Sequence, residues 1–239
     1  MLIFTTLCLL CWTQFNGVMS GPYPLEFHEN SIDDMYSDCK DMIKKKFEKF
    51  RKELEETEYD WKNERNTIKD HPFLTPDELT ALRVYTKNEN GVYSDFNSAT
   101  RTGRNVYGAS FKYHTLYFLL TSAIQKIKEH DKRCYFTYRR TYSTFEKKEK
   151  EIRLGSFTSS SLTSNLEQYG KKSCFKIKTC HGADIINYSA HPEEKEVLIP
   201  PYEVFKFVEE KVEKLKDCET VYVLESIGTK SRLDCKLVN

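Results

Sequence analysis

The stretch Glu193-Glu194-Lys195-Glu196-Val197-Leu198-Ile199-Pro200-Pro201 joins a cluster of carboxylates to an apolar run that ends at two prolines. Its apolar part predicts a short, partly buried strand that begins at Glu196. Side chains two apart on a strand share one face and lie about 7 Å apart, so Glu194 and Glu196 are expected to point the same way. Such a pair repels unless it is exposed or a cationic substrate group lies between the two carboxylates. The stretch therefore predicts a strand end that can bind a cation.

Short β-branched and aromatic runs around this stretch predict further strands at 134–138, 152–157, 173–180 and 221–224. The segment from Tyr202 to Leu215 fits a helix or a strand equally well. Before Arg133 the apolar residues recur at spacings of three and four, which predicts helices. The expected helices run from Ser31 to about Thr57, from a start signal at Thr75-Pro76-Asp77-Glu78 to a stop at Asn88-Glu89-Asn90-Gly91, and from Phe111 to Glu129. This order predicts an α+β fold, with an N-terminal helical part packed on a C-terminal mixed or antiparallel β-sandwich core.

The composition is that of one globular domain, because 239 residues can bury a substantial core and contain no low-complexity stretch. The formal net charge of +1 gives no global field that would favour nucleic acid or an anionic membrane as a partner. Residues 1–20 form an uncharged apolar run and are interpreted as a signal peptide, with a membrane anchor or buried helix as the alternative. Residues 21–239 are then expected to form a single domain, secreted and monomeric. The C-terminus carries no apolar tail for a glycolipid anchor.

Cysteine usage fits this secreted interpretation. Removal of residues 1–20 leaves six cysteines, an even number that predicts disulfides with about 15 possible pairings. A zinc site is disfavoured because the sequence contains no C-x-x-C pair, and no metal is expected. The sequon Asn187-Tyr188-Ser189 predicts a surface position for that segment if it is used.

Two further motifs carry polar groups at strand ends. Tyr138-Arg139-Arg140-Thr141 offers an arginine fork suited to a diphosphate or a carboxylate. Phe157-Thr158-Ser159-Ser160-Ser161-Leu162 lacks the G-x-S-x-G context of a serine nucleophile, so its hydroxyls are expected to hydrogen-bond a neighbouring group. Each motif alone is most often an ordinary strand end or a solvated surface. Their order, arginine, then Ser-x-Ser, then Glu-x-Glu, is far more specific.

That order resembles the R-S-E class of arginine-specific ecto-ADP-ribosyltransferases. The similarity extends over most of the chain after residue 20, from Asp33-Asp34-Met35-Tyr36 onward, and includes Val92-Tyr93-Ser94-Asp95-Phe96-Asn97, Tyr117-Phe118-Leu119-Leu120-Thr121, Phe157-Thr158-Ser159-Ser160-Ser161-Leu162, Ile177-Lys178-Thr179-Cys180-His181-Gly182 and Glu196-Val197-Leu198-Ile199-Pro200-Pro201. The resemblance implies a core of ADP-ribosyltransferase type and a strand in the ambiguous segment at Tyr202. It also implies the pairs Cys39–Cys235, Cys134–Cys180 and Cys174–Cys218.

The resemblance further implies a role for each site residue. Arg139 would bind the phosphates of NAD+, Ser159 would hold the last glutamate, Glu196 would be the essential catalytic residue, and Glu194 would select arginine. Tyr169 falls where the family has an aromatic residue that packs on nicotinamide. The family usually has glycine after the motif arginine, where the backbone passes close to nicotinamide, whereas this chain has Arg140.

The function expected from this resemblance is transfer of ADP-ribose from NAD+, a consumed co-substrate, to arginine side chains of extracellular proteins. Two alternatives remain open at this point: an NAD+ glycohydrolase, in which water takes the place of arginine, and a catalytically silent binding domain on the same scaffold. A G-x-G-x-x-G nucleotide motif is absent, so NAD-linked redox chemistry is not expected.

Overall fold

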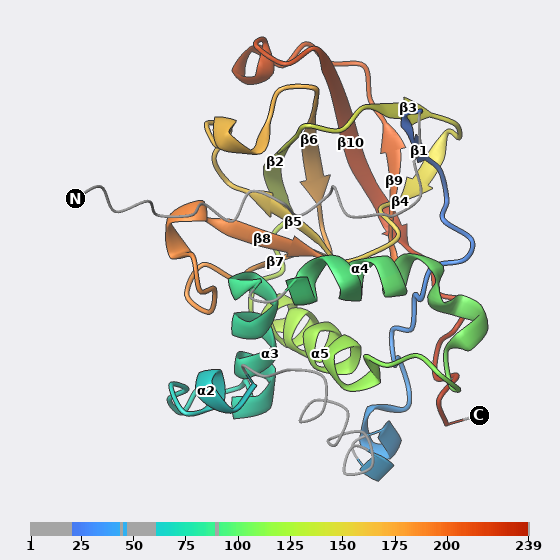
Figure 1. Cartoon of the computed structure of the whole chain (residues 1–239), viewed down its shortest axis with the longest axis vertical. Coiled ribbons are helices and arrows are strands. Elements are labelled where there is room, and N and C mark those ends of the chain that lie inside the picture. The colour runs from blue at the N-terminus through green and yellow to red at the C-terminus, as the bar shows by residue number, and fades with distance from the viewer. Residues whose placement is uncertain (1–20, 44, 47–60, 89–90, 239) are drawn as a thin grey trace.

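The computed structural model describes residues 21–43, 45–46, 61–88 and 91–238 (Figure 1). The predicted signal peptide, residues 1–20, lies outside this part of the chain. The part of the first predicted helix that follows residue 46 also lies outside it. Within the described ranges, no helix combines the length and the apolar character needed to cross a membrane.

The helices lie in the first half of the chain, as predicted. They include α2 (Trp61–Arg65), α3 (Pro76–Lys87), α4 (Val92–Thr102) and α5 (His114–His130), with the 3₁₀ turn η2 (Gly103–Val106) after α4. Three further 3₁₀ turns lie among the later strands: η3 (Glu167–Tyr169), η4 (Pro192–Glu194) and η5 (Glu213–Leu215). The predicted start of α3 is confirmed, because the Thr75 hydroxyl accepts from the Glu78 amide while the Glu78 carboxylate accepts from the Thr75 amide. Helices α2 and α4 were not predicted, since α2 is short and the buried face of α4 includes the polar residues Asn97 and Thr100.

The second half of the chain forms strands, which confirms the α+β prediction. The strands are β1 (Tyr23–Leu25), β2 (Tyr135–Thr141), β3 (Phe145–Lys147), β4 (Glu151–Arg153), β5 (Thr158–Ser161), β6 (Ser173–Thr179), β7 (Ala183–Asp184), β8 (Glu196–Ile199), β9 (Glu203–Phe207) and β10 (Thr220–Thr229). Eight of them form one sheet in the order β4-β9-β10-β6-β2-β5-β8-β7, in which only β10 and β6 pair in parallel. Strands β1 and β3 form a separate parallel pair. The ambiguous segment at Tyr202 contains β9.

Two hydrophobic cores hold these layers together. Helices α3, α4 and α5 lie on one side of the large sheet in Figure 1. Apolar residues of these helices form the larger hydrophobic core together with residues from the sheet side, such as Phe157 and Leu198. The smaller core lies between the large sheet and the β1–β3 pair and includes Leu25, Phe175 and Phe205. Strands β7 and β8, and the chain just before β5, are thereby packed against the helices.

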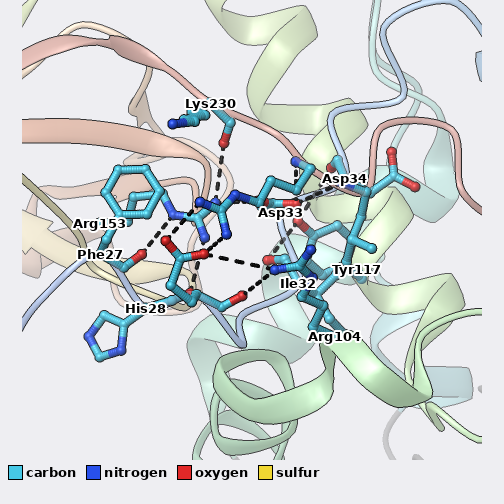
Figure 2. Close-up of polar contacts among 12 residues, drawn as sticks. Phe27, His28, Ile32, Asp33, Asp34, Arg104, Tyr117, Arg153 and Lys230 are labelled. Carbon is cyan, nitrogen blue, oxygen red and sulfur yellow. Dashed lines mark hydrogen bonds and ion pairs between the residues drawn. The ribbon is translucent and has the colours of Figure 1, made fainter.

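A buried polar cluster, here called the clasp, fastens both ends of the described chain to the sheet (Figure 2). Arg153 of β4 is fully buried, pairs with Asp33 and donates to the carbonyl oxygens of Phe27, His28 and Lys230. Asp33 Oδ1 also accepts from the Leu233 amide at 3.0 Å. Segments near residues 30 and 232 therefore meet on one guanidinium.

Asp34, next to the clasp residue Asp33, explains why one predicted helix begins late. Residues 32–36 are not helical, and among the residues of this segment that the structure describes, helix is present at 40–43 and 45–46. The Asp34 carboxylate accepts from the backbone amides of Tyr36 and Cys235 and from the Tyr107 hydroxyl, all at 2.8 to 2.9 Å. Such side-chain bonds to nearby amides compete with helix formation. The prediction of helix from Ser31 was therefore wrong for its first turns.

The predicted strand 152–157 ends early, at Arg153, because Gly155 turns the chain with a φ of 74°, and the next strand, β5, begins only at Thr158. A Cβ at Gly155 would lie 2.7 Å from the ring of His28, so this turn requires glycine. Strand β4 before the turn pairs with β9 at one edge of the sheet, whereas β5 after it pairs with β2 and β8 near the other. The Ser-x-Ser motif thus sits on β5 and not at the end of β4.

Three disulfides connect the described cysteines: Cys39–Cys235, Cys134–Cys180 and Cys174–Cys218. They are the same pairs that the family resemblance implies. Cys134–Cys180 joins the segments that flank the neighbouring strands β2 and β6, and Cys174 lies opposite Arg140 in the register of these two strands. The strand that carries Arg139 is therefore braced on its β6 side.

Candidate active site

A cavity of about 300 Å³ opens where β2, β5 and β8 face the end of α3. Arg139, Ser159, Glu194 and Glu196, the residues singled out from the sequence, all line it. The lining also includes Tyr85 to Asn88, Tyr93, Arg140 to Ser143, Ser160, Ser161, Thr163, Ser164, Leu166, Tyr169 and His191. The volume is at the lower end of the roughly 300 to 1,000 Å³ typical of small-ligand pockets.

Glu196 is the most unusual group in this cavity. It is the first residue of β8, is only 5% exposed, and its Oε1 has no hydrogen-bond partner within the described chain. Burial raises the pKa of Glu196 to about 7; a hydrogen bond from Ser159 and the charge of Arg139 act in the opposite direction, and the charge of Glu194 adds to the rise. A buried carboxylate with a free oxygen and a raised pKa is a strong sign of a functional group.

Strand alternation places Arg139 and Ser159 beside Glu196. Arg139 lies within β2 rather than at its end, and its Nη1 donates to the Ser159 carbonyl oxygen at 2.6 Å. The neighbouring β5 and β8 register brings Ser159 opposite Leu198 and Ser161 opposite Glu196. The Ser159 hydroxyl thereby comes within hydrogen-bonding range of the Glu196 carboxylate.

Glu194 reaches the cavity by a route that the sequence did not predict. It lies in the 3₁₀ turn η4 and not on the strand, so the expected shared strand face was wrong. Lys195 adopts the left-handed conformation with a φ of 49°, which turns the chain between Glu194 and the strand. The Ser161 hydroxyl donates to the Glu194 carbonyl oxygen at 2.6 Å and holds this turn against β5. The two carboxylates still line one cavity.

The segment Leu162–Gly170, here called the cavity wall, closes the cavity on the side away from α3. Its 3₁₀ turn η3 carries Tyr169, which is 40% exposed and donates its hydroxyl hydrogen to Glu194 Oε1. Tyr142, at the end of β2, donates to the Gln168 carbonyl oxygen at 3.0 Å. Tyr169 is thus connected directly to one of the two glutamates.

Tyr85 lies within the predicted helix that starts at Thr75 and was not among the predicted site residues, but it reaches the site. Its ring is fully buried. Its hydroxyl donates to the Phe157 carbonyl oxygen at 3.2 Å and accepts from Asn97 Nδ2 at 3.1 Å. The Ser159 hydroxyl lies within hydrogen-bonding range of the Tyr85 hydroxyl oxygen. Only the buried, fixed position of a tyrosine hydroxyl distinguishes this residue, and a sequence pattern does not contain that information.

Within the described residues no cluster of three or more His, Cys, Asp or Glu side chains could hold a metal ion. The polar groups around Glu196 are instead one arginine, hydroxyls and a second carboxylate. This set can bind an anion at Arg139 and stabilise a positive charge at Glu196 and Glu194.

Comparison with known proteins agrees with this arrangement. The family model described as NAD:arginine ADP-ribosyltransferase matches residues 25–232. NAD(P)(+)–arginine ADP-ribosyltransferase 2 of Gallus gallus is 39% identical over 143 residues, which are 57% of this chain and 46% of that relative. T-cell ecto-ADP-ribosyltransferase 2 of Mus musculus is 33% identical over 217 residues, which are 82% of this chain and 72% of that relative. The chain therefore matches about half the length of the first of these relatives.

A solved structure has the same architecture. The mono-ADP-ribosyltransferase ART2.2, crystallised as a variant in complex with NADH, superposes with a TM-score of 0.77 at 27% sequence identity. The match covers 90% of this chain and 99% of that chain.

Proposed function

Because the chain belongs to the NAD:arginine ADP-ribosyltransferase family, we propose that it cleaves NAD+ and transfers ADP-ribose to arginine side chains, with release of nicotinamide. The observation that carries this proposal is Glu196: a buried carboxylate with an unpartnered oxygen and a pKa of about 7, in a cavity shared with Arg139, Ser159 and Glu194. A ribose hydroxyl could donate a hydrogen bond to this unpartnered oxygen of Glu196. The donor set therefore fits the ribose and diphosphate of NAD+.

Glu196 has the position and the surroundings of a group that stabilises charge. Nicotinamide is a cationic leaving group, so its departure needs no acid, but positive charge develops on the ribose. A carboxylate acts on such charge most strongly where water is largely excluded, and Glu196 is 5% exposed. Ser159 would orient this carboxylate, and Arg139 would bind the diphosphate.

Glu194 is the candidate for recognition of the acceptor. An arginine side chain is protonated at physiological pH, so its attack on the ribose requires a group that orients it and removes a proton. Glu194 lies at the same cavity but is less buried than Glu196, which suits contact with an incoming side chain. Tyr169, which bonds to Glu194, would pack against nicotinamide.

We also propose that the protein acts outside the cell, as a single catalytic domain over residues 21–239 and as a monomer. Three disulfides, which persist in oxidising compartments, support an extracellular location. Relatives named ecto-ADP-ribosyltransferases support it as well. The acceptors would then be arginine-bearing extracellular proteins.

The test is incubation of purified protein with labelled NAD+ and agmatine, a small guanidine. We expect nicotinamide and ADP-ribosyl-agmatine to appear in step. Nicotinamide accompanied only by free ADP-ribose would instead identify an NAD+ glycohydrolase. No release of nicotinamide would identify a scaffold that binds without catalysis.

A further inference from the structure

Arg140 follows Arg139 on β2, yet its side chain has a different environment. Its guanidinium is only 4% exposed, and its Nη1 and Nη2 donate to the two carboxylate oxygens of Asp217 at 3.0 and 3.1 Å. Its Nε donates to the carbonyl oxygen of Ser164 at 2.7 Å. One buried, planar fork therefore connects two loops that are about 50 residues apart in sequence.

The first of these loops is the cavity wall. Thr163, Ser164, Leu166 and Tyr169 of this segment line the cavity. Residues 162–166 are not part of a helix or strand, so the contact from Arg140 to Ser164 fixes a stretch that has no ladder of backbone hydrogen bonds.

The second loop is itself rigidly held. Asp217 precedes Cys218, which is disulfide-bonded to Cys174 of β6, and Cys174 lies opposite Arg140 in the β2–β6 register. Lys171 also contacts the Asp217 carboxylate at 3.1 Å and Glu167 at 2.5 Å. The Arg140 guanidinium, with Lys171, holds the pKa of Asp217 well below its usual range. Asp217 is thus a charged, fixed point to which the wall is tied.

The far end of the wall is held by other contacts. Gly170 has a φ of 109°, and a Cβ there would lie 2.5 Å from the backbone of Thr141. The Tyr142 hydroxyl donates to the Gln168 carbonyl oxygen, and just beyond the wall the Lys172 backbone amide donates to the Thr141 carbonyl oxygen at 3.0 Å. Arg140 supplies the corresponding support for the Leu162–Leu166 half of the wall, through the Ser164 carbonyl oxygen.

We propose that Arg140 is a positioning residue of this site: by bridging Ser164 to Asp217 it holds the cavity wall in place and thereby sets Tyr169 against Glu194. The inference rests on the proposed function for its catalytic consequence, but the anchoring itself does not. The Arg140 guanidinium thus binds Ser164 and Asp217, whereas that of Arg139 binds the Ser159 carbonyl oxygen. Loss of the Arg140 side chain would loosen the wall without removing any group assigned to catalysis.

The first test needs no activity. Hydrogen exchange followed by mass spectrometry is compared for wild type, Arg140→Met, Arg140→Lys and Asp217→Asn. We expect faster exchange over residues 162–170 in all three variants, least in Arg140→Lys, with β8 unchanged. Asp217→Asn keeps Arg140 and alters a half-exposed residue, so it remains informative if Arg140→Met fails to fold. Wild-type exchange over residues 162–170 in Asp217→Asn and Arg140→Lys would overturn the proposal.

The second test measures KM and kcat with NAD+ and agmatine. We expect KM for NAD+ to rise roughly tenfold in Asp217→Asn, the scale of one lost charge-assisted hydrogen bond, with a smaller change in kcat for NAD+ cleavage. The double variant Arg140→Met/Asp217→Asn should be no worse than Arg140→Met, because both changes remove one bridge. Lys126→Met, which breaks the sheltered ion pair between Lys126 of α5 and Glu78 of α3, is the control for stability loss alone. An equal rise of KM in that control would overturn the proposal, whereas inactivity of wild type would refute the enzymatic function and leave the exchange test standing.

Discussion

The hydroxyl of Tyr169 donates a hydrogen bond to Oε1 of Glu194, so that a turn of the cavity wall and the turn before β8 meet beside the cavity. Burial, together with this bond to a carboxylate, raises the pKa of the Tyr169 hydroxyl. Glu194 is thereby oriented by a neutral donor, whereas Glu196 faces the cavity from inside the sheet. The two glutamates have different environments, and their substitutions are expected to differ in kind.

Glu194→Gln is expected to spare NAD+ cleavage and to reduce transfer to agmatine by roughly a hundredfold, the usual scale for loss of a general base. Glutamine keeps the size of the side chain and can still accept from Tyr169, but it cannot take a proton. Water would then capture the ribosyl group. The measurement is the ratio of ADP-ribosyl-agmatine to free ADP-ribose at matched nicotinamide release.

Glu193→Gln is the matched control for that prediction. Glu193 lies next to Glu194 in the same turn, but its side chain is 71% exposed and it does not line the cavity. Its product ratio should equal that of wild type. If Glu194→Gln also left the ratio unchanged, Glu194 would have no part in the choice of acceptor.

Glu196→Gln is expected to reduce both nicotinamide release and transfer by two orders of magnitude or more. Loss of a group that stabilises developing charge typically costs about 3 to 4 kcal/mol of transition-state stabilisation. Glutamine can still bond to Ser159 and to a ribose hydroxyl, so KM for NAD+ should change less than kcat. Initial rates at saturating NAD+ test this, and a variant with near wild-type kcat would remove Glu196 from the mechanism.

The pH dependence of activity follows from the raised pKa of Glu196, which burial brings to about 7. The carboxylate is the form that stabilises positive charge, so kcat/KM for NAD+ should rise with pH through about 7 and level off above it. The profile of kcat/KM reports the free enzyme. An acid limb centred near 4.5, the ordinary pKa of glutamate, would show that burial does not govern this group.

The same raised pKa has the opposite consequence for stability. The folded state binds the Glu196 proton more tightly than the unfolded state does, so its contribution to the free energy of unfolding falls as pH rises from 4.5 through about 7. Glu196→Gln removes this loss. Its free energy of unfolding should exceed that of wild type by up to roughly 3 kcal/mol at pH 8 and by much less at pH 5. Urea denaturation of both proteins at the two pH values measures the difference.

Local sequence patterns predicted much of the fold and identified the site motifs, but they did not predict how the chain positions these motifs around the cavity. The capping box at Thr75 and the apolar run after Glu196 act within a few residues, so they could be predicted. The turn at Gly155 and the left-handed Lys195 depend on distant contacts and backbone conformation, and they decide which strand carries Ser159 and where Glu194 points. The carboxylates of Asp33 and Asp34 bind amides about 200 residues away, and no periodicity reveals such partners.

The clasp gives a final prediction, because Arg153 and Asp33 are fully buried and the hydrogen bonds that Arg153 donates to Phe27, His28 and Lys230 all go to uncharged carbonyl oxygens (Figure 2). Asp33→Asn keeps the size of the side chain but leaves a buried guanidinium without its counter-ion, which typically costs about 3 to 5 kcal/mol. We expect a loss of that size in the free energy of unfolding, measured by urea denaturation at pH 7. Glu29→Gln, which weakens the exposed pair with Arg232, should cost less than about 1 kcal/mol. Neither residue lines the cavity, so kcat of the folded Asp33→Asn protein should match wild type. A similar, small loss in both variants would mean that the clasp contributes little to stability.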